Sequence, residues 1–288
     1  MIISQVTNLL EKQNKLNQRS LLKMGLRKPH IASKLIYERI KLGITKKPKN
    51  TKVKLFFGDE MNVVLPEKVS EFLYYFRFFE YGLTRIFLQY LKPGMVFADV
   101  GAHFGYFSLL ASKIVGETGQ VHSFEPTKSS FEVLASNSKS PNQHINNLVC
   151  WSKDSFLEFN DYGIIFSAYN SFTKPRLKKS NIHVSKNKMK CIKLDSYFTE
   201  IYPDFIKIDA ESAELDILKG MKKITEQKHP IITLEVGDIV DDLPESRKPI
   251  EYLLDRNYDC FEFKNGKILE HSIKNSYGYD NLLFLEQK

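Results

Sequence analysis

The sequence predicts an α/β fold built on a mainly parallel sheet with helices on both faces, and two observations carry that prediction. Short apolar runs alternate with helical patterns along most of the 288 residues, the order expected of consecutive βαβ units with right-handed crossovers. Glycines or carboxylates directly follow three of the apolar runs, where open parallel sheets bind their ligands. The 42% hydrophobic and 26% charged residues are typical of globular domains and exclude collagen, coiled coil and wholesale disorder.

Residues 1–50 are expected to form a basic helical extension ahead of a main domain at residues 51–288. The extension holds 12 Lys and Arg against Glu11 and Glu38, so it carries a balance of +10 and leaves −2 for the remainder of a chain whose net charge is +8. Its apolar spacing predicts one or two amphipathic helices, separated near Pro29 because proline disfavours helical conformation in the preceding residue. These helices are expected to pack on the main domain or a second subunit, or alternatively to dock on an anionic membrane.

The elements of the main domain follow in order along the chain. Gly58-Asp59 predicts a hairpin between residues 52–57 and 61–65, and an aromatic helix over residues 70–91 ends at Lys92-Pro93-Gly94. Residues 154–193 fall outside the alternation and predict a lid or hairpin insertion. The last two expected strands lack helices of their own and predict an antiparallel edge hairpin. The expected strands are 95–100, 120–124, 147–151, 205–208, 231–236, 258–263 and 282–285, with helices at 106–115, 129–136, 213–224 and 246–256.

The sequence favours a cytoplasmic location, with peripheral contact at a membrane as a second option. Arg77, Glu80 and Arg85 interrupt the most apolar long window, so it cannot supply a transmembrane helix. The first ten residues lack the basic and apolar regions of a signal peptide. The three cysteines are far apart without CxxC spacing, and the histidines are scattered, so we expect neither disulfides nor a bound metal.

A nucleotide-type site is predicted where residues 95–100 lead into a helix. The run DVGAHFG at residues 99–105 contains Gly101 and Gly105, which permit a tight turn and a close approach of a ligand to the backbone. Glu125 ends the second strand, where a carboxylate accepts hydrogen bonds from both ribose hydroxyls. A dinucleotide would require GxGxxG, and Asp99 would repel pyrophosphate while suiting the ammonium of a methionine moiety. The residues favour S-adenosylmethionine, with a dinucleotide or a purely structural turn as alternatives.

Three carboxylates follow the strand expected at residues 205–208. Asp209 and Glu211 are expected to face the same crevice as Gly101 and Glu125, because ligands of open α/β sheets sit outside the carboxyl ends of the strands. A carboxylate there can deprotonate or orient a substrate hydroxyl. The alternative is that Glu211 and Glu214 only complement the positive end of the following helix.

Four runs in this order resemble the FkbM-type S-adenosylmethionine-dependent methyltransferases. The runs are FADVGAHFGYFSLL, HSFEP, FIKIDAESAELDILKG and IITLEV, and the resemblance extends over roughly residues 51–285. The family commonly has Asn at the position of His103 and Gly at the position of Ser212. The resemblance implies a class I methyltransferase (Rossmann-like) fold with a seven-stranded, mainly parallel sheet, which transfers a methyl group usually to a hydroxyl oxygen.

Matching the motifs residue by residue assigns the site. The resemblance places Ser152 and Lys153 near the adenine, Glu125 on the ribose and Glu80 at the methionine end of the cofactor. The catalytic candidates, which line the methyl-transfer crevice, are Asp209 and Glu211. The full set of expected cofactor contacts is Glu80, Asp99, Gly101, Ala102, His103, Gly105, Glu125, Pro126, Ser152, Lys153 and Asp209.

These features together predict an S-adenosylmethionine-dependent O-methyltransferase acting on a glycan, a lipid-linked sugar or another small metabolite. Residues 172–193 contain eight basic and no acidic residues, which favours an anionic acceptor entering from the insertion at 154–193. One alternative is an RNA methyltransferase or nucleic-acid-binding protein that uses the basic segments to contact phosphates. Another is a non-catalytic adaptor that keeps the cofactor pocket as a scaffold.

Overall fold

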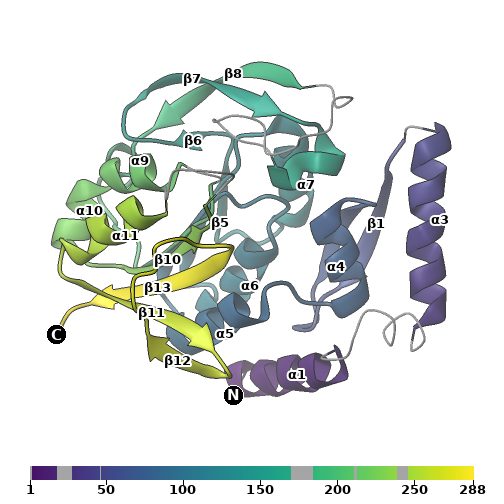
Figure 1. The fold of residues 1–288 in the computed structure, drawn as a ribbon, viewed down its shortest axis with the longest axis horizontal. Helices are drawn as coiled ribbons and strands as arrows, with labels where there is room; N and C mark the ends of the chain where they lie inside the picture. The colour runs from purple at the N-terminus through teal and green to yellow at the C-terminus, as the bar shows by residue number, and fades with distance from the viewer. Residues whose placement is uncertain (1, 18–27, 46, 170–183, 211–212, 239–245) are drawn as a thin grey trace.

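A central sheet of eight strands organises the computed structural model, which describes residues 2–17, 28–45, 47–169, 184–210, 213–238 and 246–288. The strands of this sheet are β3 (Val96–Val100), β4 (Gln120–Phe124), β5 (Gln143–Asn146), β9 (Phe205–Ile208), β10 (Ile231–Val236), β11 (Tyr258–Lys264), β12 (Lys267–Glu270) and β13 (Asp280–Glu286). Their order across the sheet is β12-β11-β13-β10-β9-β3-β4-β5 (Figure 1).

The five strands from β10 to β5 are parallel, and the remaining pairs are antiparallel. Along the chain the strand order runs from β3 outward through β4 to β5, then returns to β9 on the other side of β3. The carboxyl ends of β3 and β9 therefore flank the switch point at which open α/β sheets bind ligands. The expected class I methyltransferase fold is confirmed, and it puts Gly101 and Asp209 on neighbouring strand ends.

The described part of the sheet has one strand more than the expected seven. The additional strand is β12, which pairs antiparallel with β11 across the two-residue turn Asn265-Gly266. Both turn residues have positive φ, 52° and 80°, as a tight hairpin turn of this kind requires. The expected antiparallel pairing of the last two predicted strands is confirmed, because β11 pairs with β13. Their expected edge position was wrong, since β12 forms the edge and β13 lies between β10 and β11.

The strand expected at residues 147–151 is shorter than predicted, at Val149–Cys150, and its expected place in the main sheet was wrong. The third parallel strand is β5 at 143–146, a polar strand at the sheet edge whose sequence carries no apolar run. The apolar pair Val149-Cys150 instead forms β6 in a second sheet, where it pairs with β8 (Ser185–Ile192), and β8 pairs antiparallel with β7 (Ser155–Asp161). Figure 1 shows this second sheet along the upper edge of the molecule.

Helices cover both faces of the main sheet because its strands are apolar on both sides. Along β3, Phe97 packs against one face, with Phe87 of α5 (Tyr81–Tyr90) and Phe107 of α6 (Tyr106–Val115). Ala98 and Val100 point to the other face, as alternation along a strand requires. The helices that contribute buried residues to that second face are α8 (Leu194–Tyr197), α9 (Glu214–Lys219), α10 (Lys222–Gln227) and α11 (Arg247–Leu254).

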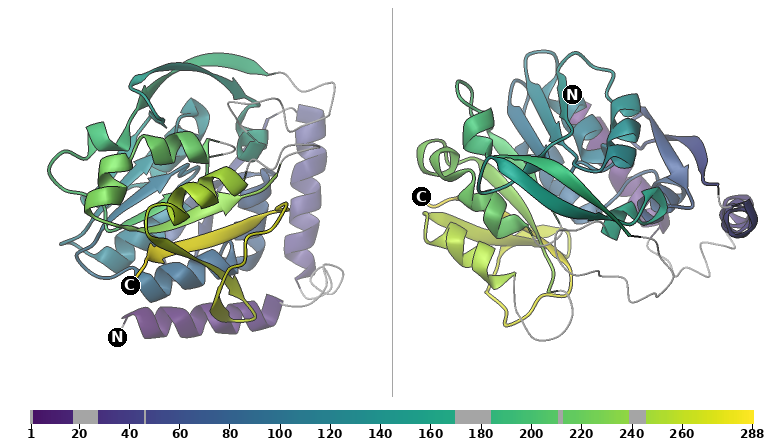
Figure 2. Two further views of the ribbon diagram at one scale, coloured as in Figure 1. Left: turned by 60° about the vertical axis from the view of Figure 1, so that its left-hand side comes forward. Right: turned by 90° about the horizontal axis from the view of Figure 1, so that it is seen from above.

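The N-terminal part adds two helices and a small hairpin beside the main sheet. Strand β1 (Lys49–Lys54) pairs antiparallel with β2 (Glu60–Leu65), so the first strand of the expected hairpin begins and ends earlier than residues 52–57. In Figures 1 and 2, one N-terminal helix lies below the sheet and the other stands at the margin beside β1. The helices of this part are α1 (Ile2–Asn17), α3 (Pro29–Thr45) and α4 (Lys68–Phe76).

The single aromatic helix expected at residues 70–91 is two helices, α4 and α5, separated at residues 77–80. Arg77 ends α4 in the left-handed conformation with φ 73°, and Glu80 has φ 39°. Neither position holds glycine, so the sequence contains no helix-breaking residue at this point. Among the described helices, none is both long and apolar enough to cross a membrane.

Candidate active site

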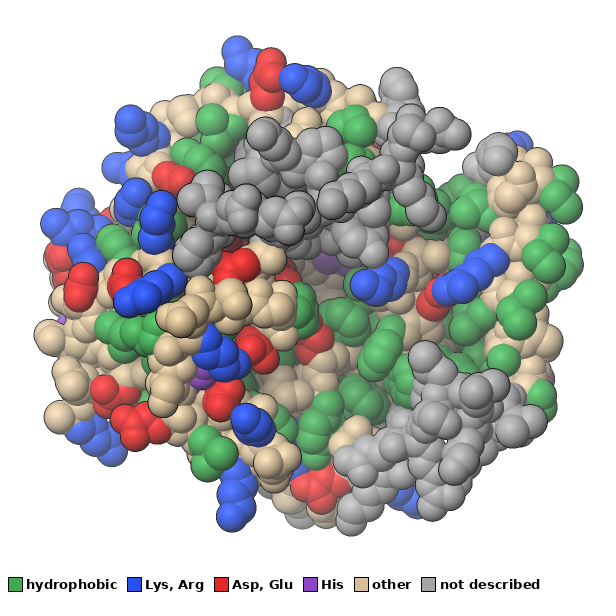
Figure 3. Space-filling view, viewed as in Figure 1, with side chains coloured by type: hydrophobic (Ala, Val, Ile, Leu, Met, Phe, Trp, Pro, Cys, Tyr) green, Lys and Arg blue, Asp and Glu red, His purple; other side chains and the backbone are tan. Residues whose placement is uncertain are grey.

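A cavity of about 590 Å³ lies at the switch point of the sheet. Its wall includes Phe72 of α4 and Ile217 of α9, two helices on opposite sides of the view in Figure 1. In Figure 3, acidic side chains gather near the middle of the visible face, beside apolar ones. The expected site residues that line this cavity are Glu80, Gly101, Ala102, His103, Glu125, Pro126 and Asp209.

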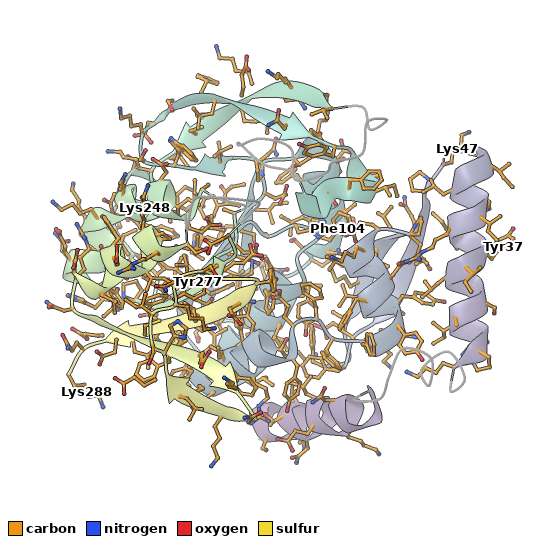
Figure 4. The ribbon with its side chains drawn as sticks, in the orientation of Figure 1. Tyr37, Lys47, Phe104, Lys248, Tyr277 and Lys288 are labelled. Atoms are coloured by element: carbon orange, nitrogen blue, oxygen red, sulfur yellow. The ribbon has the colours of Figure 1, made fainter. Side chains whose placement is uncertain are left out.

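The turn after β3 is fixed against the end of β9. Gly101 has φ 78°, and a Cβ atom built there would lie 1.8 Å from the carbonyl oxygen of Asp209, so only glycine fits. The N–H groups of Gly101 and Ala102 both donate to the carbonyl of Phe124, each at 3.0 Å. The ends of β3, β4 and β9 are thereby held together around the cavity. Figure 4 labels Phe104, which belongs to the same turn, near the centre of the molecule.

Gly105 supports the turn and lies outside the cavity wall. It precedes α6 with φ 91°, and a Cβ atom there would come within 2.6 Å of the side chain of Leu134. Its role in this geometry is close packing of α6 against α7 (Lys128–Asn137).

Glu125 presents a buried carboxylate at the end of β4. One oxygen accepts a hydrogen bond from the N–H of His103 and the other from the N–H of Thr127, both at 2.9 Å. Burial is the main cause that raises the pKa of Glu125 to about 7, although these bonds oppose it. The side chain of Thr127 also hydrogen-bonds to this carboxylate, which is thus held rigidly at the cavity wall and keeps lone-pair capacity for a ligand.

A buried lysine that motif spacing did not single out organises the acidic side of the cavity. The Nζ of Lys207, on β9, lies 3.1 Å from Oδ2 of Asp209 and 3.4 Å from Oδ1 of Asp99. Asp99 is buried within β3 behind the wall, where it also accepts a hydrogen bond from Ser108 at 2.6 Å. The structure thus places Asp99, an expected cofactor contact, outside the cavity wall and in an ion pair with Lys207.

Asp209 stays ionised because of its neighbours. Burial opposes the charge, but the Lys207 ammonium and a hydrogen bond from Glu235 hold the pKa of Asp209 below its usual range. Burial and the Asp209 charge raise the pKa of Glu235 well above its usual range, so Glu235 is the protonated member of the pair. Both carboxyl groups line the cavity.

Glu80 completes the acidic side from the break between α4 and α5. Its carboxylate accepts a hydrogen bond from the hydroxyl of Tyr279, which also lines the cavity. Burial, followed by the Asp209 charge, raises the pKa of Glu80 to about 7. A non-glycine residue with positive φ is strained, and such strain is found preferentially at functional sites.

His103 connects the β3–α6 turn to the 3-10 helix η1 (Ile164–Tyr169). Its Nε2 lies 2.7 Å from the hydroxyl of Ser167, which itself donates to the carbonyl of Ile164, so Nε2 carries the proton. Burial lowers the pKa of His103, so the ring is neutral. The imidazole serves here as a hydrogen-bond donor that holds η1 over the cavity.

Besides Asp99 and Gly105, two further expected contacts lie outside the wall, and two residues of the third motif lie outside the described residues. Ser152 donates to Asp216 at 2.8 Å, and Lys153 is exposed to solvent. The wall beyond β4 consists instead of Thr127, Leu148, Val149, Cys150 and Ile217. Glu211 and Ser212 belong to the part of the chain that is not described.

The opposite part of the wall is mainly apolar and comes from β2 and α4. The rings of Phe72 and Phe79 meet edge to face at 5.6 Å, and Lys68 is the basic residue that α4 contributes. Only the register of α4 and the break after it place these residues together, so no motif could have identified them. The residues of this part are Met61, Lys68, Val69, Phe72 and Phe79.

Comparisons with known proteins identify the family to which the chain is similar. A family model described as methyltransferase FkbM domain matches residues 99–260. A crystal structure of methyltransferase FkbM from Methylobacillus flagellatus KT is 15% identical, with a TM-score of 0.39; the match covers 66% of this chain but only 43% of that one. No curated protein matches the chain.

Two further solved structures are similar at lower identity. A putative rRNA methylase from Clostridium thermocellum is 8% identical with a TM-score of 0.44, and the match covers 72% of this chain and 94% of that one. Fibrillarin from Aeropyrum pernix, bound to S-adenosyl-L-methionine, is 8% identical with a TM-score of 0.41 over 68% and 67% of the two chains. Since the family model covers more than half of the sequence, the chain belongs to the FkbM methyltransferase family.

Proposed function

We propose that the protein transfers a methyl group from S-adenosylmethionine to a hydroxyl oxygen of a small amphipathic acceptor. The observation that carries the proposal is the shared cavity in which Gly101, Glu125 and Asp209 meet at the switch point. Membership of the FkbM methyltransferase family supports methyl transfer.

The described cavity wall fits S-adenosylmethionine better than a dinucleotide. Its carboxyl groups are Glu80, Glu125, Asp209 and Glu235, against the two cations Lys68 and Lys207. Above pH 7, Glu80, Glu125 and Asp209 are ionised and Glu235 is protonated, so three carboxylates face two lysines. This balance favours a sulfonium and an ammonium and disfavours a pyrophosphate. The two oxygens of Glu125 suit a pair of ribose hydroxyls, and the apolar residues Leu148, Val149 and Ile217 suit an adenine face.

Bound S-adenosylmethionine would supply a methyl group already activated by its positively charged sulfur. The residues of the chain then have to position the acceptor, exclude water and take one proton. Asp209 is the candidate base, because it is ionised and its carboxylate lines the cavity. A low pKa does not prevent this role, since a hydroxyl becomes strongly acidic as its oxygen gains the methyl group.

The wall from β2 and α4 supports an amphipathic acceptor. Met61, Val69, Phe72 and Phe79 offer an apolar surface, while Lys68 favours an anionic group at the same wall. We therefore propose that the acceptor joins its reactive hydroxyl to both an apolar and an anionic part, as in a lipid-linked sugar.

The test is transfer of labelled methyl from S-adenosylmethionine into an extract of the organism that encodes the protein. We expect label in the butanol-soluble, alkali-stable fraction. Asp209→Asn should lower the rate by about 100-fold or more, within the range of general base catalysis, while the exposed Asp255→Asn keeps it. Label that ribonuclease releases would support an RNA acceptor instead, and no transfer into any fraction would contradict the proposal.

A further inference from the structure

The two N-terminal helices differ in how they meet the rest of the protein. Helix α1 buries Val6 and Leu10 in the main core, and Glu11 forms an ion pair with Arg85 of α5. Helix α3 stands at the margin, where Figures 1 and 2 show it beside β1 and α4. The helix that is available for a partner is therefore α3.

The inner face of α3 contacts helix α4. Ile31 packs on Tyr75 of α4, and Arg39 forms an ion pair with Glu71 of the same helix. The Nζ of Lys34 donates to the hydroxyl of Tyr74 at 2.7 Å. These contacts fix which side of α3 faces outward.

The outer face of α3 is also apolar. Ile36, Ile40 and Ile44 follow at four-residue intervals, and Tyr37 lies beside them. Their exposed fractions are 58%, 59%, 78% and 58% respectively, and Figure 4 shows Tyr37 pointing away from the body of the protein. Large apolar side chains that gather on one exposed helix face indicate a surface that a partner covers.

The charges around this outer face are of one sign. Lys41 and Lys47 are exposed at its edge and just after the helix. The one acidic residue of α3, Glu38, is buried on the inner side and pairs with Lys49 at 3.0 Å. The outer face of the described helix thus combines isoleucines and an interfacial tyrosine with cations and without a carboxylate.

We propose that the outer face of α3 docks on an anionic lipid surface. Such a surface accepts the isoleucines at the boundary of its acyl chains and attracts the lysines to its headgroups. Tyrosine is enriched at that depth, because its ring is apolar and its hydroxyl polar. A second copy of the chain is the poorer occupant, since two α3 faces packed together would oppose Lys41 and Lys47 to like charges.

Docking through α3 has a consequence for the cavity. Helix α4 contacts α3 through Glu71 and Tyr75, and it contributes Lys68, Val69 and Phe72 to the cavity wall. Helices α3 and α4 therefore lie between the lipid surface and the site. The docking proposal itself does not depend on the identity of the acceptor or on methyl transfer.

The test is co-sedimentation of the full chain with vesicles of phosphatidylcholine alone or mixed with phosphatidylglycerol. We expect binding to the mixed vesicles that weakens with salt, and little binding to phosphatidylcholine alone. The double variant Ile40→Glu/Ile44→Glu should bind about tenfold more weakly or worse. The matched control is Ile201→Glu/Ile273→Glu, which changes exposed isoleucines elsewhere and should bind like the unaltered protein.

Thermal unfolding of both double variants would verify that they fold. The proposal is overturned if the unaltered protein does not co-sediment with the mixed vesicles, or if both double variants lose binding equally. It is also overturned if sedimentation equilibrium shows a dimer that Ile40→Glu/Ile44→Glu dissociates, because a second copy would then cover the face.

Discussion

A Cβ atom at Gly101 would lie 1.8 Å from the carbonyl oxygen of Asp209, so the turn after β3 and the end of β9 touch through their backbones. This contact sets the distance between the two motifs that the sequence places more than 100 residues apart. It also leaves the side chain of Asp209 facing the cavity beside Lys207.

Gly101→Ala should destabilise the protein by about 3 kcal/mol or more, because the added carbon meets a backbone oxygen that cannot rotate away. Urea unfolding measures the effect. Gly266→Ala is the matched control, since Gly266 has nearly the same φ, 80° against 78°, with nothing within 4 Å. The control should lose only about 1 kcal/mol through backbone strain, and equal losses would show that the contact with Asp209 is unimportant.

Lys207→Met should destabilise by about 3–5 kcal/mol near neutral pH, because it leaves Asp99 and Asp209 buried without their cation. Lys228→Met removes the half-exposed ion pair with Asp204 and should cost about 1 kcal/mol or less. Both values come from denaturant unfolding.

The loss in the free energy of unfolding caused by Lys207→Met should become smaller as the pH falls. In the unaltered protein the lowered pKa of Asp209 stabilises the fold above pH 3.8, and that contribution disappears as the pH falls through the folded pKa. Without the lysine the pKa of Asp209 rises above its unfolded value, so protonation then favours folding. A deficit that stays constant between pH 8 and pH 5 would contradict this electrostatic role.

Affinity for S-adenosylmethionine should depend on pH through Glu125. Its pKa of about 7 means that the carboxylate becomes protonated just below neutral pH, and a protonated carboxyl loses acceptor capacity for the ribose hydroxyls. We expect the dissociation constant to rise about tenfold per pH unit below pH 7 if one proton is linked to binding. Glu125→Gln should bind more weakly at pH 8 and lack this dependence; the same slope in the variant would assign the titration to another group, such as Glu80.

Ser167→Ala should loosen η1 over the cavity, because the Nε2–H of His103 loses its acceptor. Hydrogen exchange of the Phe166 amide, which donates to Gly163, should become faster in the variant. Ser136→Ala, which removes a hydroxyl on the exposed side of α7, should leave that exchange unchanged. Unchanged exchange in Ser167→Ala would show that the contact with His103 does not hold η1.

The sequence alone predicts those site residues that directly follow a strand. The runs that form β3, β4 and β9 are each followed directly by a glycine or a carboxylate, so the sequence alone predicts that these residues meet at one edge of the sheet. Gly101, Glu125 and Asp209 are identified in this way. Neighbouring positions on parallel strands explain why they line one cavity.

Other parts depend on contacts between distant segments that no local pattern encodes. The edge strand β5 is polar, so the third strand was predicted instead around the apolar pair Val149-Cys150. The adenine contacts were then expected after that pair, at Ser152 and Lys153. Lys207 is a single lysine within an apolar run and belongs to no recognised motif, and only the fold brings it within reach of Asp99. Glu80 was expected inside a helix, whereas packing of the aromatic segment breaks the helix just before it.

Calorimetric titration of the protein with S-adenosylmethionine and, in parallel, with NAD tests the central claim most directly. The account predicts binding of S-adenosylmethionine in the micromolar range at pH 8 and no heat with NAD. Glu125→Ala should weaken the binding, and the exposed Glu132→Ala on α7 should preserve it. Binding of NAD, or no binding of S-adenosylmethionine by the folded protein, would contradict the assignment of this cavity to a methyl donor.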